Sequence, residues 1–435
     1  MSSENAHKVA DLIASGKLCI GDGYRAKNSE LGSAGIPFAR AGDINDGFHF
    51  KSGDHLPEGD AWKAGNKLSQ VGDVVFTSKG TVGRFGYVTD SIQKFVYSPQ
   101  LCFWRSLDRN AINPRFLFYW VQSKEFYQQY KSVSQKTDMA EYVSLSDQRS
   151  MEITLPFSGQ QRAIAHILGT LDDKIELNRK TNETLEAMAK ALFKSWFVDF
   201  DPVRAKAEGR PTGLPAEISD LFPDSFEDSE LGEIPSGWQV NSLDEVAHFL
   251  NGLALQKFPS EDGAPTLPVI KIAQLKKGDS IGADRCSAAV PADYVVRDGD
   301  VLFSWSGSLA VDIWCGGDGA LNQHLFKVTS KSYGKWFFLQ WVKHHLPEFQ
   351  EIAQGKATTM GHIQRHHLSE AKALIPPPSL LAAMDPAFAA LLDRAFGLRR
   401  QSKDLASIRD ALLPKLISGE IRIPDAEKML EEVGI

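Results

Sequence analysis

The chain has 435 residues, a formal net charge of −7, 43% hydrophobic residues and 24% charged residues. This length accommodates two well-buried domains with connectors, and the composition is ordinary for a soluble protein. No apolar run approaches the length of a membrane span, and the first residues carry no basic-then-apolar signal. The four cysteines are scattered without a C-x-x-C pair, which fits a reducing cytosol and argues against a structural zinc. We therefore expect a cytoplasmic protein with no membrane partner.

Charge is segregated along the chain. The stretch Asp201–Trp238 holds nine acidic residues against three basic ones, with five prolines, which predicts a solvated linker. The stretch Lys331–Lys372 holds six Lys and Arg against three Glu, and five of the eleven histidines. Because the local field steers a polyanion more than the total charge does, the negative sum does not exclude a nucleic-acid partner.

The first 157 residues are predicted to form a globular domain. A short amphipathic helix is expected over Asn5–Ile13. Strands separated by glycine-rich turns are expected at Pro37–Arg40, Val71–Thr77, Phe85–Thr89 and Leu101–Trp104. A helix over Pro114–Tyr130, a polar loop around Ser134–Ala140, a helical turn at Ser146 and a strand at Ile153–Phe157 follow.

A long helix is predicted from Gln160 to Phe197. Its apolar residues alternate spacings of four and three, the 3.5-residue period of a coiled-coil seam. At roughly 1.5 Å per residue it would span about 57 Å, so we expect a rod rather than a core helix. The seam positions that we assign to it are Ile164, Leu168, Leu171, Ile175, Asn178, Asn182, Leu185 and Leu192.

A second rod is predicted from Leu380 to Ser418. We place Pro386 in its first turn and expect Pro414 to bend its last turn. Polar seam residues such as Ser402 cost stability but fix register and partner choice. The seam positions of this rod are Phe388, Leu391, Leu398, Leu405, Ile408, Leu412 and Leu416. After it we expect a short strand over Gly419–Pro424 and a capping helix over Asp425–Val433.

The two halves of the chain repeat one plan. Ordered matches pair Gly72–Phe76 with Gly299–Phe303 and Phe116–Val121 with Phe337–Val342, and other short segments match in the same order. The offset drifts only from about 231 to 221 residues. A fixed order of matches indicates an internal duplication of a globular unit followed by a rod.

These patterns predict an α+β protein with an internal pseudo-two-fold repeat, in which two globular domains are separated by two long helices that pair as an antiparallel coiled coil. The expected boundaries are residues 1–157 for the first domain, 158–198 for the central spacer helix, 199–237 for the linker, 238–378 for the second domain, 379–418 for the second spacer helix and 419–435 for the terminal strand and helix.

We find no complete catalytic constellation. The chain has neither a G-x-G-x-x-G fingerprint after a strand nor a G-x-x-x-x-G-K-[ST] loop. Glu370-Ala371-Lys372 resembles half of a nuclease site, but so short a tripeptide is common by chance. The spacing of His362, His366 and His367 could bind a metal, but a solvated or phosphate-facing histidine cluster is the simpler interpretation. We therefore expect no metal and no cofactor in this chain.

Several motifs together resemble the specificity subunit of a type I restriction–modification system. They are PFSGQQRAIA at 156–165, LDDKIELN at 171–178, SWFVDFDPV at 195–203, SELGEIPSGW at 229–238 and LLPKLISGEI at 412–421. The resemblance covers essentially the whole chain. In two places the chain departs from it. The first unit lacks the Leu-Gly-Glu-Ile-Pro leader, and the second rod opens with Leu-Leu-Ala-Ala where the first has Gly-Gln-Gln-Arg.

The resemblance implies two target-recognition domains, each reading half of an interrupted, asymmetric site on double-stranded DNA. It implies that two methyltransferase subunits dock on the rods and domains, and that restriction subunits, which combine motor and nuclease, join this core. S-adenosylmethionine, ATP and Mg²⁺ would then belong to those partners. The bases that are read and the gap between half-sites do not follow from the family.

Candidate DNA contacts should be polar, lie on loops and sit near strand ends, where Arg and Lys can take guanine edges or phosphates and Gln and Asn can take adenine edges. In the first domain we select Lys27, Arg40, Ser78, Lys79, Thr81, Arg84, Gln100, Lys136 and Thr137. In the second domain we select Gln256, Lys257, Lys271, Ser304, Trp305, Asn322, Gln323, His324, Lys356, Thr358 and Thr359. For any one of them a solvated surface role is the competing interpretation.

Two other classes of function compete with a DNA-specificity subunit. A self-contained nuclease or methyltransferase would need the cofactor and carboxylate motifs that we do not find. A coiled-coil adaptor that binds only proteins would explain the rods, but it would not explain two duplicated domains with basic loops.

Overall fold

The structure is a computed structural model that describes residues 5–44, 47–50, 53–79, 83–134, 143–355, 361–432 and 434. It divides into two compact units, residues 1–175 with 404–435 and residues 176–403. Two long helices pass through both units: α6 (Ser158–Phe197) and α13 (Pro378–Ser418). Their bounds lie within two residues of the predicted rods. Because each compact unit takes in part of each rod, the units do not coincide with the predicted domain boundaries.

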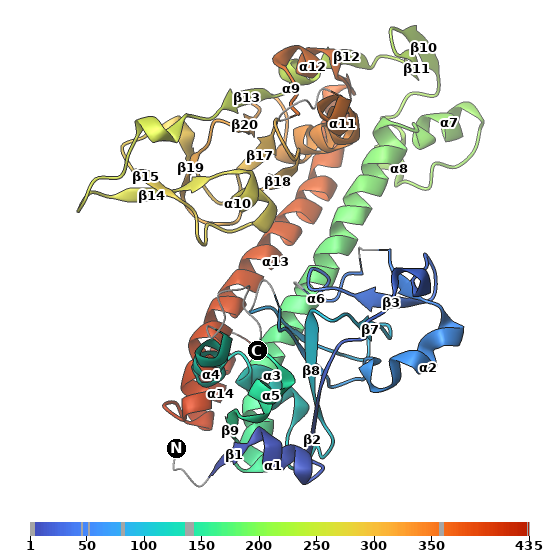
Figure 1. The fold of residues 1–435 in the computed structure, drawn as a ribbon. Helices are drawn as coiled ribbons and strands as arrows, with labels where there is room; N and C mark the ends of the chain where they lie inside the picture. Colours follow the sequence, from blue (N-terminus) through green and yellow to red (C-terminus); the bar gives the residue numbers. More distant parts are fainter. Residues whose placement is uncertain are drawn as a thin grey trace. The chain divides into compact units, whose positions relative to one another are not determined.

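The first unit is built on two small sheets and a helical layer (Figure 1). Strands β2 (Leu18–Asp22), β8 (Leu101–Ser106), β5 (Val74–Thr77) and β6 (Phe85–Tyr87) form an antiparallel sheet in that order. A second sheet has the order β4 (His55–Leu56), β3 (Ile36–Ala39) and β7 (Val96–Tyr97), with β3 and β7 parallel. The remaining elements are β1 (Ala6–Lys8) paired with β9 (Glu152–Thr154), and the helices α1 (Val9–Ala14), α2 (Ala61–Ala64), α3 (Pro114–Trp120), α4 (Lys124–Ser134), α5 (Leu145–Arg149) and α14 (Ile423–Glu432).

The second unit repeats this topology. Its main sheet has the order β13 (His248–Asn251), β20 (Leu325–Thr329), β17 (Val301–Ser304) and β18 (Val311–Ile313). The smaller sheet has the order β15 (Arg285–Ser287), β14 (Thr266–Ile270), β19 (Gly319–Leu321) and β16 (Val295–Val296), and β14 and β19 are again parallel. In Figure 1 this smaller sheet lies on the side of the main sheet away from α11 (Lys335–Gly355).

Other elements of the second unit flank this core. They are β12 (Gln239–Ser242) paired with β21 (Lys372–Ile375), the hairpin of β10 (Phe226–Ser229) and β11 (Gly232–Pro235), and the helices α7 (Asp201–Ala207), α8 (Ala216–Ser219), α9 (Leu243–Val246), α10 (Ile272–Lys277) and α12 (Arg365–Glu370). Matching strand orders in the two units confirm the predicted duplication.

The two rods pair antiparallel within each unit. In the first unit the early part of α6 meets the late part of α13, where Asp172 accepts from Arg409 Nη1 at 2.6 Å. In the second unit the late part of α6 meets the early part of α13, where the Trp196 and Phe388 ring centroids are 5.7 Å apart. Asn178 Nδ2 donates to Ser402 Oγ at 3.3 Å, so the predicted polar seam positions face each other.

The seam is tighter in one unit than in the other. In the first unit the seam side chains are at most 4% exposed, apart from the half-buried Ile175 and Ile408: they are Ile164, Leu168, Leu171, Leu405, Leu412 and Leu416. In the second unit Asn178, Asn182, Phe388 and Leu398 are buried, whereas Leu185, Leu192 and Leu391 are only half-buried. Hydrophobic residues next to the seam, such as Ile167 and Phe193, are buried against their own unit.

The predicted solvated linker is wrong. Residues 201–238 fold into α7, α8 and a hairpin, and Val203, Phe222, Ile234 and Trp238 are buried in the core of the second unit. The acidic residues of this segment are exposed, so a count of charges did not reveal that its apolar residues are buried. Helix α14 follows α13 as α7 follows α6. Its Ala426 and Leu430 are buried in the core of the first unit.

Four smaller predictions also need correction. Within the helix expected at Asn5–Ile13, Ala6–Lys8 form strand β1 and pair with β9, and the helix begins only at Val9. The helix expected over Pro114–Tyr130 is two helices. The strand expected at Gly419–Pro424 does not form, because Gly419 has a φ of 74° and Ile421 N–H donates back to the Lys415 carbonyl. Pro386 is not in the first turn of its helix, which begins at Pro378.

Candidate nucleic-acid interface

A basic residue follows the equivalent strand in each unit. Arg40 comes after β3 and Lys271 comes after β14, and both side chains are exposed. The backbone N–H of Arg40 donates to Asp43 Oδ2 at 2.8 Å, and that of Lys271 donates to Gln274 Oε1 at 3.2 Å. The duplicated turn therefore presents a cation at the same place in both units.

Each of these cations already has a carboxylate partner. Arg40 forms an ion pair with Asp54, and Lys271 forms one with Asp284. The Lys271 ammonium lowers the pKa of the Asp284 carboxyl by hydrogen bonding and charge. Exposed pairs of this kind contribute at most about 1 kcal/mol, so a phosphate can replace the carboxylate at little cost.

In the first unit two more of the selected residues gather beside Arg40. Arg84 Nη1 donates to the Ala41 carbonyl at 2.9 Å, and Gln100 Oε1 accepts from Ala41 N–H at 3.4 Å. Both bonds converge on the residue that follows Arg40. The fold thus brings two guanidinium groups and one amide to a single loop, a combination suited to a phosphate and a base edge.

In the second unit the selected residues gather around Trp305. The indole Nε1–H is shared between Asn251 Oδ1 at 2.9 Å and the Gln323 carbonyl at 3.2 Å. The Trp305 ring lies 6.0 Å from the His324 ring and 6.3 Å from the His362 ring, between centroids. A half-buried aromatic surface edged by imidazole and amide groups can stack on a base or meet its polar edge.

The hydrogen bonds of His324 hold this cluster together. His324 Nδ1 lies 2.9 Å from Ser306 Oγ, and its Nε2 lies 3.3 Å from the Gln323 amide nitrogen. The position of Ser306 is also fixed by a β-bridge to His362. Sequence reasoning missed Asn251 and Ser306. The pair Asn251-Gly252, which matches Asp22-Gly23 in the first unit, could have marked the loop.

Three selected residues are buried, which contradicts a role as surface contacts. Ser78 is 1% exposed. Ser304 is fully buried, and its Oγ donates to the Ser308 carbonyl and accepts from Ala310 N–H at 2.8 Å. Asn322 is 5% exposed, and its Oδ1 accepts from His324 N–H at 3.3 Å. All three are at or next to a strand end, and the hydrogen bonds of Ser304 and Asn322 stabilise the adjoining turns.

The remaining selected residues are exposed or lie outside the described part of the chain. Lys27, Lys79, Gln256 and Lys257 are exposed on loops or short helical turns. The residues that lie outside the described ranges are Thr81, Lys136, Thr137, Lys356, Thr358 and Thr359.

Family motifs in the first rod anchor it to the first unit. Gln161 is buried; its Oε1 accepts from Asn113 N–H at 2.9 Å and its Nε2 donates to the Pro156 carbonyl at 2.8 Å. Asp172 accepts from the Tyr119 hydroxyl at 2.5 Å, and Asp173 pairs with Arg115 at 2.6 Å. Burial and the Asp172 charge raise the pKa of Tyr119, which keeps this phenol a donor.

One histidine group has a geometry that could hold a metal. Ligand atoms of His366, His367 and Glu370 lie within 4.8 Å of one another, so a carboxylate does approach the histidines. However, His367 Nδ1 accepts from Gln364 N–H at 2.9 Å, and Glu370 is exposed. The expectation that this chain holds no metal stays a prediction.

Comparison with known proteins identifies the family. The family model described as "Type I restriction modification DNA specificity domain" matches residues 17–187 and 235–380. The chain belongs to this family. Its two matched regions include the main sheet and the smaller sheet of each unit, so the duplication is one of DNA specificity domains.

Named relatives agree with this assignment. The type I restriction enzyme HindI specificity subunit of Haemophilus influenzae is 24% identical, over 82% of this chain and 88% of that protein. The MjaIX specificity subunit of Methanocaldococcus jannaschii is 26% identical, over 82% and 80%. The crystal structure of the S subunit from M. genitalium shares the fold, with a TM-score of 0.54, 15% identity and coverage of 94% of this chain and 95% of that one.

The chain is thus a type I specificity subunit, whose role is DNA recognition rather than catalysis. Among the described residues, no helix is both long and apolar enough to cross a membrane.

Proposed function

We propose that each unit reads one half of a bipartite, asymmetric site on double-stranded DNA. The observation that carries this proposal is the duplicated turn that presents Arg40 in one unit and Lys271 in the other. Duplicated readers suit a site with two half-sites. Since the neighbouring side chains differ, with Arg84 and Gln100 in one unit and Trp305 and His324 in the other, the two half-sites differ in sequence.

The rods set the spacing between half-sites and dock two methyltransferase subunits, and restriction subunits join the assembly. S-adenosylmethionine, ATP and Mg²⁺ act in those partners, where an adenine is extruded and methylated. What supports this division of labour is the family membership together with rods whose polar seam, at Asn178 and Ser402, fixes a single register.

The test is to map methylated adenines in a genome that carries the intact system, and then to repeat the mapping after inserting one heptad into both rods. One heptad adds about 10 Å, which is roughly three base-pair rises. We expect the gap between half-sites to grow while both half-sites stay the same. A change in the half-sites themselves would show that the rods do not act as a ruler.

A gel shift of the chain with and without its methyltransferase subunit separates this proposal from the other two classes. The proposal is supported if the chain binds DNA sequence-specifically and if this binding requires the methyltransferase subunit or is strengthened by it. Methylation or cleavage by the purified chain alone, or a partner complex that shows no sequence preference, would contradict it.

A further inference from the structure

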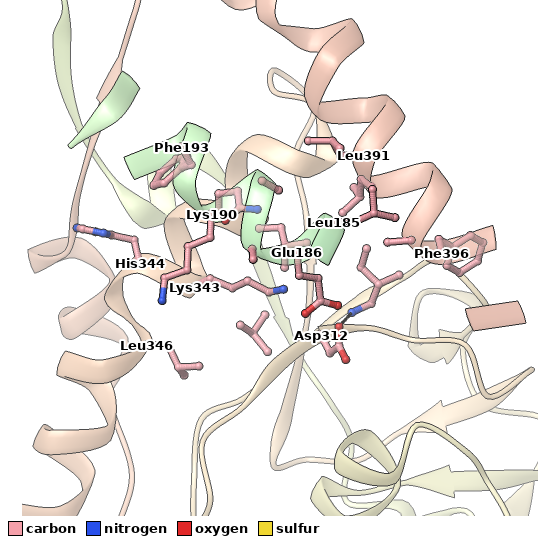
Figure 2. A pocket seen from close by; sticks show the side chains of 18 of the residues that line it. Leu185, Glu186, Lys190, Phe193, Asp312, Lys343, His344, Leu346, Leu391 and Phe396 are labelled. Carbon is pink, nitrogen blue, oxygen red and sulfur yellow. Dashed lines mark hydrogen bonds between the residues drawn. The ribbon is translucent and has the colours of Figure 1, made fainter. Parts of the chain in front are cut away.

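The second unit contains a pocket of about 500 Å³ between the rods and its helical layer. Its walls come from α6, α13, α11 and β18, and they are mostly apolar (Figure 2). The half-buried seam residues Leu185 and Leu391 face this space, whereas most seam side chains of the first unit are buried. The pocket is therefore a local opening of the coiled-coil seam.

The first unit fills the equivalent space with its own side chains. The repeat aligns Tyr119 with Gln340, and the seam pattern aligns Asp172 with Leu392. In the first unit the Tyr119 hydroxyl donates to Asp172 at 2.5 Å. In the second unit the shorter Gln340 and the apolar Leu392 cannot make this bond, and both line the pocket.

No described residue hydrogen-bonds the side-chain amide of Gln340. Gln340 is 7% exposed and lines the pocket, and its amide keeps some contact with solvent. An occupant of the pocket would satisfy this group.

The pocket also has a cationic end. Within the described part of the chain, Lys190 of α6 and Lys343 of α11 form neither hydrogen bonds nor ion pairs, and Figure 2 shows them toward one end with Phe193. At the other end Arg399 pairs with both Glu186 and Asp312, which leaves one negative charge there, so the two free ammonium groups still give a net charge of +1 for these five side chains. The net charge available to an occupant is therefore positive.

This cationic end is specific to the second unit. The seam pattern aligns Lys190 with Asp410, which pairs with Arg409 at 2.8 Å, and the repeat aligns Lys343 with Gln122. The opening and the two unpaired ammonium groups thus occur together in the second unit.

We propose that this pocket binds one small amphipathic anion, with an apolar body of roughly ten to fifteen atoms and a carboxylate or phosphate head. The body lies against Phe193, Leu391 and Phe396, and the head meets Lys190, Lys343 and the Gln340 amide. A volume of 500 Å³ is in the range of ligand sites, and is about three times a cavity of roughly 150 Å³ that holds benzene.

The experiment is isothermal titration calorimetry of the full chain with decanoate and with decyl phosphate, which distinguish the two heads. Decyltrimethylammonium and decanol are the charge controls. We expect one saturable site for an anion, no saturable binding of the cation and weaker binding of the alcohol. Replacing Lys190 and Lys343 with Gln should weaken the anion about fivefold, as expected for two partly exposed ion pairs.

Two further variants localise the site. Gln340→Tyr, which restores the side chain of the first unit, should fill the pocket and weaken binding more than tenfold. The matched double variant Lys124→Gln/Lys331→Gln, which removes two exposed charges elsewhere, should bind like the parent, and thermal unfolding should show all variants folded.

The proposal is overturned if neither anion saturates, if the cation binds as tightly, or if the Lys190/Lys343 variant behaves like the Lys124/Lys331 control. It is also overturned if the methyltransferase subunit displaces the anion and binds the Lys190/Lys343 variant more weakly than the parent chain. The pocket would then be a protein-docking site. None of these outcomes depends on whether the chain reads DNA as proposed.

Discussion

In the first unit Asp73 is fully buried and accepts four hydrogen bonds from three groups, whereas its counterpart Asp300 in the second unit is partly exposed and holds two groups. Asp73 accepts from Arg105 at 2.6 and 2.7 Å, from the Tyr97 hydroxyl at 2.6 Å and from Gln70 N–H at 2.8 Å. Asp300 accepts from Arg297 N–H at 2.8 Å and lies 3.6 Å from Lys327. Burial and the Asp73 charge raise the pKa of Tyr97, so its hydroxyl remains a donor.

This difference shows which parts of the duplicated unit are constrained. Strand order, the parallel strand pair and the turn after β3 or β14 are the same in both copies. The buried polar groups, by contrast, have been replaced together, as Tyr119 with Asp172 became Gln340 with Leu392. The same backbone fold therefore accommodates two different polar networks in the core. It also carries two different sets of candidate DNA contacts.

The largest effect should come from removing the buried carboxylate. Asp73→Ala leaves the Arg105 guanidinium buried without its partner, so we expect a loss of about 3–5 kcal/mol in the free energy of unfolding. Asp300→Ala should cost about 1 kcal/mol, because its ion pair is partly exposed. Denaturant titration, with hydrogen exchange to resolve the two units, measures both; equal losses would contradict the comparison.

The next effect should be alike in the two units. A Cβ on Gly23 would lie 1.9 Å from the Ser98 carbonyl oxygen, and one on Gly252 would lie 2.2 Å from that of Asn322. Gly23→Ala and Gly252→Ala should each cost about 1–3 kcal/mol, because two backbone segments must move apart. Gly42→Ala, where a Cβ meets open space, is the control. If only one of the two Ala variants lost unfolding free energy, the backbones would not be equivalent at these two sites.

A smaller effect should distinguish the filled and open seams. Tyr119→Phe removes the donor to Asp172 and should cost about 1–2 kcal/mol of unfolding free energy. Gln340→Leu removes an amide without a partner among the described residues, so we expect no loss or a slight gain in stability. Thermal unfolding of the two variants and the parent is the measurement. A loss at Gln340 as large as that at Tyr119 would mean that the amide is satisfied after all.

The smallest effect concerns the exposed cations. Lys79→Ala should leave stability within about 0.5 kcal/mol, weaken DNA binding, and lower the slope of log K against log salt by about 1 if Lys79 contacts a phosphate. Trp305→Phe, in the matching loop of the second unit, should weaken binding without changing that slope. An unchanged salt series for Lys79→Ala would remove this lysine from the interface.

The rods, the duplication and most strands were predictable because they depend on local periodicity and on ordered matches. The helix break after Trp120 was not, because it depends on Ser123, whose Oγ accepts from Phe126 N–H at 3.3 Å. The matching helix α11 stays continuous even though Pro347 lies inside it. A proline count would have placed the break in the wrong copy.

The candidate site was only partly predictable. Arg40, Arg84 and Gln100 could be selected as polar residues near strand ends, but their convergence on Ala41 is a tertiary contact. Ser78 and Ser304 passed the same test and are buried, because composition does not reveal which way a strand-end side chain points. The pocket was invisible in the sequence, since its lining comes from four separate elements.

Each rod contributes to both units, and this affects the order in which the chain can fold during synthesis. The core of the first unit includes Ile164, Leu168 and Leu171 from the early chain and Leu405, Leu412 and Leu416 from its end. Residues 176–403 must be translated between them, which takes roughly ten to fifty seconds at about 5–20 residues per second. During that time the apolar stripe of the first rod has no partner from the second, so the unit that starts first on the ribosome is the last to be completed.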